Sequence, residues 1–272
     1  MEHVSNCEVC GNAIFTPELA KDHFIIVKCL KCGLEFVNPR LTMFENRDFY
    51  EDSSVSYGRY LDRETFDTQI QKAVVKGILR YKQCGRFLDV GCAIGNRLQV
   101  AKDYFEIYGV EIAEWAAKYA SERLGIEIWQ NPIEELWLPS NFFDVITFSE
   151  VIEHLHSPAA FLREIHRILS VGGIVYLTTG NTLSLDALYW KEKWYYYAPQ
   201  YHLFYFNHRN MKLLLSKTEF EILESRGSIR VLDMFDIFSA YPDIFRFLRG
   251  VVGKFSWRGF TVANMGVIAR KL

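Results

Sequence analysis

The stretch FLDVGCAIGN, residues 87–96, runs from an apolar segment into a glycine-containing loop. The apolar residues predict a buried strand, and Gly91 and Gly95 let the chain turn sharply and approach a ligand, because glycine has no Cβ. Asp89 stands at the end of this strand, where its charge would repel a pyrophosphate, and Ala93 replaces the middle glycine of a dinucleotide-binding loop. The loop therefore favours a ligand that carries an ammonium group.

Apolar segments of strand length alternate with helical segments on both sides of this loop. The expected strands cover residues 86–90, 106–110, 127–130, 144–148, 173–179, 220–225 and 264–270. The expected helices cover residues 70–81 and begin near residues 96, 113 and 157. The sequence thus predicts an α/β fold, a Rossmann-like mixed seven-stranded sheet sandwiched by helices, with ligands at the carboxyl ends of the strands.

Composition limits the classes of protein to which the chain can belong. Half of the 272 residues are hydrophobic, enough for a sizeable core, and 31 basic and 33 acidic side chains give a net charge of -2. This balance argues against a nucleic-acid partner and against an electrostatic membrane anchor. The first residues lack the pattern of a secretion signal, and no apolar run is long enough to span a bilayer, so we expect a cytoplasmic protein.

Four cysteines in the first 40 residues occur as two pairs, Cys7 with Cys10 and Cys29 with Cys32. Each pair has the C-x2-C spacing of a structural zinc site, and a glycine follows each pair, as a tight turn around a metal requires. So small a segment cannot bury enough apolar surface to fold alone, and bound zinc supplies the missing stability. We therefore predict a zinc-ribbon module over residues 1–40.

The rest of the chain divides by composition. We expect a connector and a helix over residues 41–84 that cover the bound ligand, and a main domain over residues 85–272. Residues 180–210 are rich in aromatic side chains and are expected to form a loop over the substrate. The amphipathic segment 228–260 is expected to be an insertion that acts as a lid or a homodimer surface, and a weak contact with a membrane surface stays open.

The segment EVIEHLH, residues 150–156, follows the fourth strand of the main domain. If it makes a helical turn, Glu150, Glu153 and His154 lie on one face, because they are spaced at i, i+3 and i+4. Such a set can bind a magnesium ion, transfer a proton or satisfy backbone groups at the strand end. A complete metal site needs another ligand from a distant segment, for which His202 is the candidate.

At these residues the chain resembles the class I S-adenosylmethionine-dependent methyltransferases. The likeness extends from about residue 87 to residue 179, and five motifs occur in the order and spacing of that family. They are the loop DVGCAIGN, the acid Glu111, the segment NPIEELWLP, the segment FDVITFSEVIEHL and the segment LREIHRILSVGG. The resemblance implies the fold already predicted, and S-adenosylmethionine as the cofactor.

The resemblance also implies the residues that bind the cofactor. Those expected to hold its methionine part are Asp89, Gly91, Ala93 and Gly95. Those expected at its ribose and adenine are Glu111, Ile112, Asn131 and Ile133, and those expected beneath it are Ser149 and Glu150. A carboxylate such as Glu111 can accept hydrogen bonds from both hydroxyls of a ribose.

A zinc ribbon joined to this core is similar to proteins of sugar and cell-surface polysaccharide pathways. In the related deoxysugar C-methyltransferases, a histidine followed by aromatic residues and leading into a helix is the general base. His202 matches that place, Tyr201 departs from the acid often found before it, and His154 is a further catalytic candidate. The resemblance thus implies methyl transfer to a hydroxyl or carbon of a small polar metabolite, with a sugar or nucleotide-sugar as the expected acceptor.

Two alternatives stay open. One is a magnesium-assisted O-methyltransferase that acts on a quinone precursor or an RNA 2′-hydroxyl and uses Glu150, Glu153 and His154. These residues resemble the E-x-x-E-H set of the small-RNA 2′-O-methyltransferases and of the ubiquinone-pathway O-methyltransferases. The other is a non-catalytic scaffold that binds the cofactor and docks through its zinc ribbon.

Overall fold

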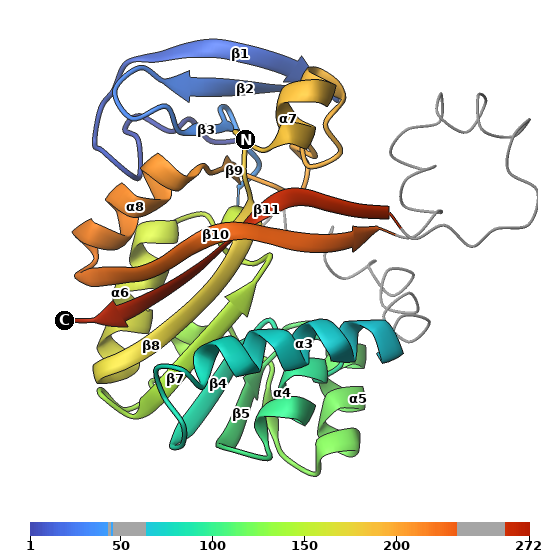
Figure 1. The fold of residues 1–272 in the computed structure, drawn as a ribbon. Helices are drawn as coiled ribbons and strands as arrows, with labels where there is room; N and C mark the ends of the chain where they lie inside the picture. Colours follow the sequence, from blue (N-terminus) through green and yellow to red (C-terminus); the bar gives the residue numbers. More distant parts are fainter. Residues whose placement is uncertain (43–44, 46–63, 233–258) are drawn as a thin grey trace, which may run out of the picture.

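The computed structural model describes residues 1–42, 45, 64–232 and 259–272. Seven strands form the central sheet: β4 (Arg86–Val90), β5 (Glu106–Val110), β6 (Ile128–Trp129), β7 (Phe143–Ser149), β8 (Leu169–Gly180), β10 (Phe220–Leu232) and β11 (Gly259–Lys271). Their order is β10-β11-β8-β7-β4-β5-β6 (Figure 1). Strands β4 to β8 are parallel, and β11 is antiparallel to both of its neighbours. The predicted mixed seven-stranded sheet is confirmed.

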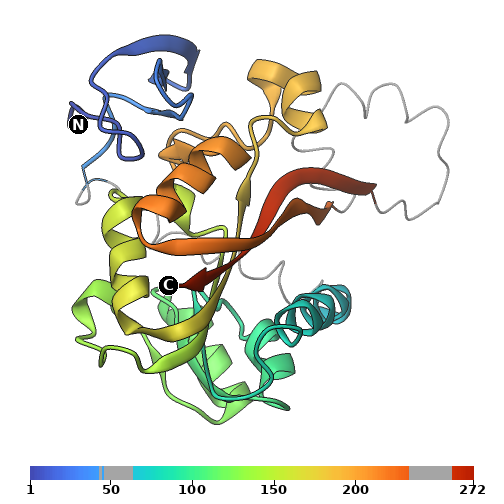
Figure 2. The ribbon, with the colours of Figure 1, turned by 60° about the vertical axis from the view of Figure 1, so that its left-hand side comes forward.

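Helices cover both faces of this sheet (Figures 1 and 2). The helices are α3 (Glu64–Ile78), α4 (Asn96–Ala101), α5 (Glu114–Leu124), α6 (Pro158–Ile168), α7 (Leu185–Trp190) and α8 (His208–Lys217), with short 3-10 turns η1 (Ile133–Glu135), η2 (Ile152–His154) and η3 (Lys191–Lys193). Strand residues alternate between the two layers: Phe87 packs with α3, α4 and α5, whereas Leu88 packs with α6 and α8. Both layers are apolar, and the site residues lie at the strand ends.

The start of α6 follows directly from its sequence. Ser157 is the N-cap, its hydroxyl accepts a hydrogen bond from the backbone N–H of Ala160 at 3.4 Å, and Pro158 takes the first helical position. At the other end of this helix, the ammonium of Lys271 donates to the carbonyl oxygens of His166 and Leu169. These contacts fix the helix that follows the EVIEHLH segment.

The N-terminal module forms a second sheet with the main domain. Its strands are β1 (Phe15–Lys21), β2 (Phe24–Cys29) and β3 (Glu35–Val37), and β9 (Phe204–Tyr205) from the aromatic segment completes the order β1-β2-β3-β9. The strand β9 pairs antiparallel with β3, and the rings of Phe36 and Phe204 lie 6.1 Å apart. The buried residues of the module are continuous with the core under α6 and α8. The module of residues 1–40 therefore shares its sheet and its core with the main domain.

The aromatic segment 180–210 buries several of its rings and exposes residues around α7. Trp194, Tyr196 and the run from Leu203 to Phe206 are fully buried, and the first two pack with Ile26 and Val37 of the module. Tyr189 is exposed on α7, and Tyr201 is partly exposed. Most of these rings consequently join the module to the main domain.

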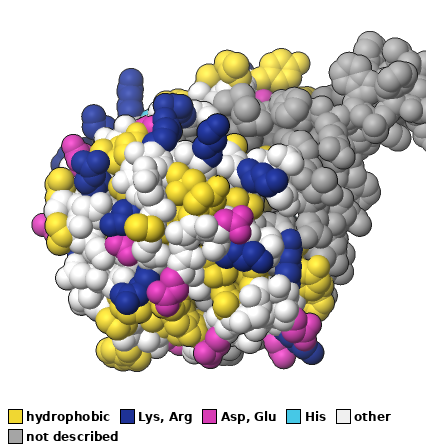
Figure 3. All heavy atoms as spheres, turned by 60° about the horizontal axis from the view of Figure 1, so that its bottom comes forward, with side chains coloured by type: hydrophobic (Ala, Val, Ile, Leu, Met, Phe, Trp, Pro, Cys, Tyr) yellow, Lys and Arg dark blue, Asp and Glu magenta, His cyan; other side chains and the backbone are white. Residues whose placement is uncertain are grey.

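Parts of the predicted organisation lie outside the described residues. These are positions 43–44 and 46–63 of the connector and positions 233–258 of the segment expected to be a lid or dimer surface. Within the described part of the chain, no helix is both long enough and apolar enough to cross a membrane. The face seen in Figure 3 carries basic and acidic side chains interspersed.

Replacing Phe36 by alanine tests whether the module and the main domain share one core. Phe36 is buried and contacts Phe15 and Phe204, so we expect its truncation to lower the free energy of unfolding by about 3 to 5 kcal/mol, measured by urea denaturation. The control is Tyr104→Ala, since Tyr104 is 49% exposed and its loss should change stability by less than about 0.5 kcal/mol. Separate unfolding transitions for module and domain would contradict the shared core.

Candidate active site

The candidate site lies where the order of the sheet reverses. The chain proceeds from β4 to β5 and β6 on one side, and returns through β7 and β8 on the other. In such sheets, a crevice opens at the carboxyl ends of the two strands that flank the reversal. Those ends are Val90 and Ser149, which precede the glycine loop and the EVIEHLH segment respectively.

The glycine loop has a left-handed backbone at three positions. Gly91, Ala93 and Gly95 have φ angles of 71°, 47° and 78°. This conformation is strained for Ala93, by about 1 to 2 kcal/mol, because its Cβ approaches the following carbonyl. The carboxylate of Glu111 offsets the strain by accepting a hydrogen bond from the backbone N–H of Ala93 at 2.9 Å. The side chain of Glu111, which directly follows β5, thus stabilises this loop conformation.

Glu111 links the loop to the start of α5. Its second carboxylate oxygen accepts from the backbone N–H of Ala113 at 2.9 Å. Burial raises the pKa of Glu111, while the N–H groups of Ala113 and Ala93 act in the opposite direction. A carboxylate has about four acceptor sites, so two remain for hydroxyl groups of a ligand.

Asp89 and Arg97 form a buried ion pair at the base of the loop. Arg97 Nη1 lies 2.9 Å from Asp89 Oδ1, and the same oxygen accepts from the hydroxyl of Thr147 at 2.6 Å. Arg97 also donates to Ser149 Oγ at 2.8 Å and to Gln71 Oε1 at 2.8 Å. Burial raises the pKa of Asp89, and the charge of Arg97 opposes this shift. Residues of α3, α4, β4 and β7 therefore meet at this guanidinium.

The residues expected at the adenine differ in accessibility. Ile112 is 54% exposed and Asn131 is exposed, so both can contact a planar ligand. Ile133 is 2% exposed and belongs to the core at η1. Its side chain is therefore less accessible to a ligand than those of Ile112 and Asn131.

The EVIEHLH segment forms the turn η2 and places Glu153 in the interior. Its carboxylate accepts hydrogen bonds from the Thr179 hydroxyl at 2.9 Å and from the Tyr196 hydroxyl. The Tyr196 hydroxyl accepts from the backbone N–H of Gly180 at 2.7 Å. Burial, together with the charges of Glu150 and Glu153, raises the pKa of Tyr196, so the phenol remains a donor.

Glu150 has a positive φ of 55°, and its carboxylate lies 3.2 Å from the Tyr196 hydroxyl that also bonds Glu153. Its carboxylate accepts from Asn264 Nδ2 at 2.7 Å and from the Thr178 hydroxyl at 3.0 Å. A left-handed glutamate costs energy, and strained residues of this kind cluster at functional sites. The position of Glu150 at the end of β7 is that expected for a residue beneath the cofactor.

His154 and His202 lie together although 48 positions separate them in the sequence. Their ring centroids are 4.8 Å apart. Nδ1 of His154 lies 3.0 Å from the Tyr201 carbonyl oxygen, and Nδ1 of His202 lies 2.7 Å from the Tyr196 carbonyl oxygen. A carbonyl only accepts, so each Nδ1 carries a proton, and a ring in its neutral form would have Nε2 as its proton acceptor. Burial lowers the pKa of His154, so its ring stays neutral near pH 7.

Glu153, His154 and His202 form a cluster whose ligand atoms all lie within 4.8 Å of one another. The spacing predicted Glu150, Glu153 and His154 as one set, with His202 as the distant candidate to complete it. In the structure, Glu150 bonds Thr178, Asn264 and the Tyr196 hydroxyl. Tyr201 contributes its carbonyl oxygen to the site through the bond to His154. The structure therefore brings His202 and Glu153 into one cluster and leaves Glu150 beside it.

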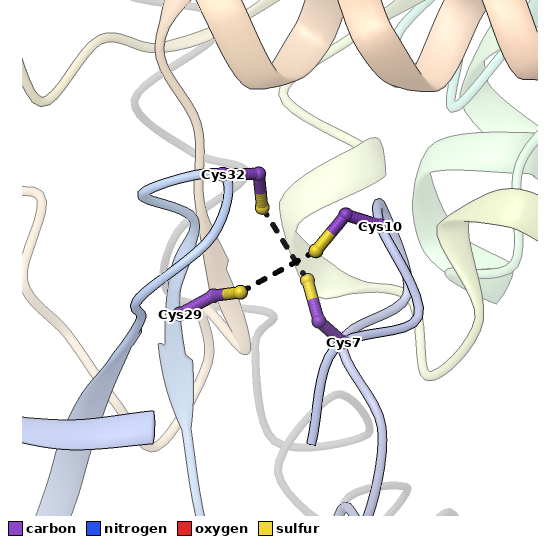
Figure 4. Close-up of side chains that lie close together, drawn as sticks. All are labelled: Cys7, Cys10, Cys29 and Cys32. Carbon is purple, nitrogen blue, oxygen red and sulfur yellow. Dashed lines mark hydrogen bonds between the residues drawn. The ribbon is translucent and has the colours of Figure 1, made fainter. Parts of the chain in front are cut away.

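The four cysteines of the module converge (Figure 4). Sγ of Cys7 lies 3.5 Å from Sγ of Cys32, and Sγ of Cys10 lies 3.4 Å from Sγ of Cys29. All four sulfur atoms lie within 4.8 Å of one another. Four thiolates around a tetrahedral zinc ion, at about 2.3 Å each, have similar separations.

The thiols of this group differ in acidity. Burial acts to raise the pKa of Cys29, but the backbone N–H groups of Cys32 and Lys31 lower it to about 7. The hydrogen bond to Cys32, together with burial, raises the pKa of Cys7. Backbone N–H groups that face sulfur stabilise thiolates, as a metal-binding knuckle requires.

Comparison with known proteins identifies the core. A family described as "Methyltransferase domain" matches residues 62–225, which is more than half of the chain. The chain belongs to the class I S-adenosylmethionine-dependent methyltransferases. This match includes the glycine loop, Glu111 and both histidines of the cluster. It ends before the last strand and excludes the N-terminal module.

Individual relatives agree with this assignment. The chain is 34% identical over 102 residues to a ubiquinone biosynthesis O-methyltransferase of Parvibaculum lavamentivorans, which covers 35% of this chain and 40% of that protein. It is 32% identical over 100 residues to the 2-methyl-6-phytyl-1,4-hydroquinone methyltransferase of Synechocystis, which covers 35% of this chain and 31% of that protein. Each match thus spans less than half of the relative.

Solved structures share the fold. A S-adenosylmethionine-dependent methyltransferase from Archaeoglobus fulgidus superimposes with a TM-score of 0.53 at 20% identity, covering 78% of this chain and 99% of that one. A phosphoethanolamine N-methyltransferase of Haemonchus contortus, in complex with S-adenosylhomocysteine, gives a TM-score of 0.54 at 19% identity, covering 87% of this chain and 62% of that one. At such identities, the likeness establishes the fold.

Several site residues escaped the sequence reasoning. Arg97 carries a signal, because a charged residue in the first turn of a helix that must pack on a sheet needs a buried partner. Tyr196 and Asn264 carry none, since one tyrosine in an aromatic run looks like the others and Asn264 stands in a late apolar strand. Their roles arise from contacts between distant segments.

Replacing Glu111 by glutamine tests the link between the loop and the cofactor. An amide keeps one acceptor oxygen and sets an NH2 group against a backbone N–H, so we expect the Kd for S-adenosylmethionine to rise about 10- to 100-fold in calorimetry. The exposed Glu114, three positions later, gives the matched control Glu114→Gln, which should bind normally. An unchanged Kd for Glu111→Gln would remove this carboxylate from cofactor binding.

Proposed function

We propose that the protein transfers the methyl group of S-adenosylmethionine to a hydroxyl group of a small molecule. The observation that carries this proposal is the pair of neighbouring imidazoles, His154 and His202, whose Nδ1 atoms both face backbone carbonyls. A hydroxyl acceptor loses its proton as the methyl group arrives, and a neutral imidazole near pH 7 is suited to take it. His202 is the proposed general base.

The cofactor side of the site fits this chemistry. The left-handed loop at Gly91, Ala93 and Gly95 exposes backbone without bulky side chains, and Glu111 retains two acceptor sites. Ile112 is exposed where the adenine is expected. When bound, S-adenosylmethionine supplies an electrophilic methyl group, and the protein's own part is to position the acceptor in line and to exclude water.

The rigidity of His202 follows from its neighbours. Its ring lies 4.3 Å from the ring of Tyr196, whose hydroxyl is bonded to Glu153. The backbone N–H of Leu203, the next residue, donates to the Glu153 carbonyl at 2.8 Å. A base held in this way keeps one orientation toward the acceptor, which supports its proposed role.

Replacing His202 by alanine should lower turnover about 100-fold or more while the Kd for S-adenosylmethionine stays unchanged. Turnover is measured as S-adenosylhomocysteine formed with a panel of catechols and quinone precursors, sugars and nucleotide-sugars, and RNAs. The matched control is His208→Ala, since His208 is also half-buried and bonds Ser225 outside the site. Full turnover by His202→Ala would exclude it as the base.

The panel also separates the classes of acceptor. One relative is named a ubiquinone biosynthesis O-methyltransferase and another a hydroquinone methyltransferase, and the first name favours an aromatic hydroxyl. The likeness to sugar-pathway proteins favours a sugar or nucleotide-sugar. Binding of S-adenosylmethionine without turnover on any acceptor would favour the scaffold function instead. We rank the aromatic hydroxyl first because it rests on relatives that match the catalytic core.

A divalent cation is the second candidate for the cluster. Glu153, His154 and His202 could act as its ligands, and the Nδ1 bonds of both histidines to carbonyls are the usual support of metal-ligating imidazoles. Two imidazoles and one carboxylate suit manganese, iron or zinc better than magnesium. Turnover that is lost with a chelator and restored by manganese would favour this function, and chelator-insensitive turnover would contradict it.

We further propose that Cys7, Cys10, Cys29 and Cys32 bind one structural zinc ion. The convergence of four sulfur atoms supports this proposal, as do Gly11 and Gly33, which close the two turns with φ angles of 73° and 72°. Metal analysis should give about one zinc per chain, and Cys29→Ser should lose it. The control is Cys84→Ser, since Cys84 is exposed and distant in sequence. A folded, metal-free wild-type protein would contradict the proposal.

A further inference from the structure

We propose that Arg97 binds the carboxylate of the methionine part of S-adenosylmethionine, beside the ammonium that Asp89 is already expected to bind. The buried ion pair is then a receptor for a zwitterion, with one charged partner for each end of the amino-acid group. This inference rests on the proposed function only for the identity of the methyl donor and is independent of the acceptor.

The position of Arg97 supports this role. It is the second residue of α4, directly after the loop, and its guanidinium lies where α3, α4, β4 and β7 meet. Two of these elements, β4 and β7, flank the reversal of the sheet order. The partner Ser149 ends β7 and precedes Glu150, so the guanidinium stands between the loop and the segment expected beneath the cofactor.

Among the described residues, the hydrogen bonds of Arg97 leave two of its N–H groups available for a ligand. A guanidinium has five N–H groups. Within the described part of the chain, Arg97 uses one on Nε for Gln71, one on Nη1 for Asp89 and one on Nη2 for Ser149. One N–H remains on each terminal nitrogen, which is the set that a bidentate carboxylate needs. Arginine is preferred over lysine for such recognition because its donors form a fixed fork.

The charge balance also favours a zwitterionic ligand. The side chains of Asp89 and Arg97 are 4% and 8% exposed, so both charges have lost most of their water. A buried pair of this kind seldom adds net stability, and an apolar residue would cover the sheet at lower cost. A ligand with both signs of charge can enter next to the pair without leaving a net buried charge.

The experiment compares two ligands in calorimetry: S-adenosylmethionine and its decarboxylated form, which keeps the ammonium and the sulfonium but lacks the carboxylate. Arg97→Met should weaken binding of S-adenosylmethionine by roughly 100-fold and binding of the decarboxylated ligand by less than about threefold. Arg97→Lys, which keeps the charge but not the fork, should give an intermediate loss for S-adenosylmethionine. The matched control is Arg163→Met, since Arg163 is exposed on α6.

Asp89→Asn completes the comparison, because it should weaken both ligands to a similar degree. Equal losses for both ligands in Arg97→Met, or no loss for either, would overturn the proposal and leave Arg97 as a structural partner of Asp89. A wild-type protein that does not bind S-adenosylmethionine would overturn it as well. Binding with the expected preference, but without turnover on any acceptor, would contradict only the proposed transfer.

Discussion

The pairing of β3 with β9 is the constraint on which the candidate active site depends. Two residues of the module, Glu35 and Phe36, pair with Tyr205 and Phe204. The residue before β9 is Leu203, whose carbonyl accepts from Val37 and whose N–H donates to the carbonyl of Glu153. His202 therefore lies one residue from a main-chain bridge between the cysteine module and the EVIEHLH turn. Backbone hydrogen bonds of this kind are costly to leave unmade in the interior, so the arrangement is fixed.

Side chains reinforce this bridge on both sides of the site. The Tyr197 hydroxyl donates to Glu35 at 2.6 Å, and Arg40 donates to the His156 carbonyl at 2.9 Å. The hydroxyl of Ser157 donates to Glu8 at 3.0 Å, within the first cysteine pair. The module thus contacts both segments that supply the cluster residues. A metal ion that stabilises the four-cysteine site would in this way also hold the histidines in place.

The site has two polar regions with different tasks. One contains Asp89, Arg97 and Glu111 around the glycine loop, and its charges match the polar groups of the methyl donor. The other contains Glu153, His154 and His202 near Tyr196, and its groups can accept a proton or bind a cation. Glu150 stands beside both, at the end of β7. The proposed methyl-donor site and the proposed acceptor site are thus built from different sets of residues.

Local patterns in the sequence determined the strands, the glycine loop, the cap at Ser157 and the two cysteine pairs, because each depends on residues close together in the chain. They could not determine which side chains meet across the fold. The spacing of Glu150, Glu153 and His154 predicted one trio, but the bond of Glu150 to Asn264 of β11 leaves it beside the cluster of Glu153, His154 and His202. The sequence offered His202 as the distant residue that could join this set. Its position beside His154, like the pairing of Asp89 with Arg97, exists only once β7, β9 and α4 are packed. Contacts of this kind depend on how the sheet brings distant segments together, and no period or spacing in the sequence records them.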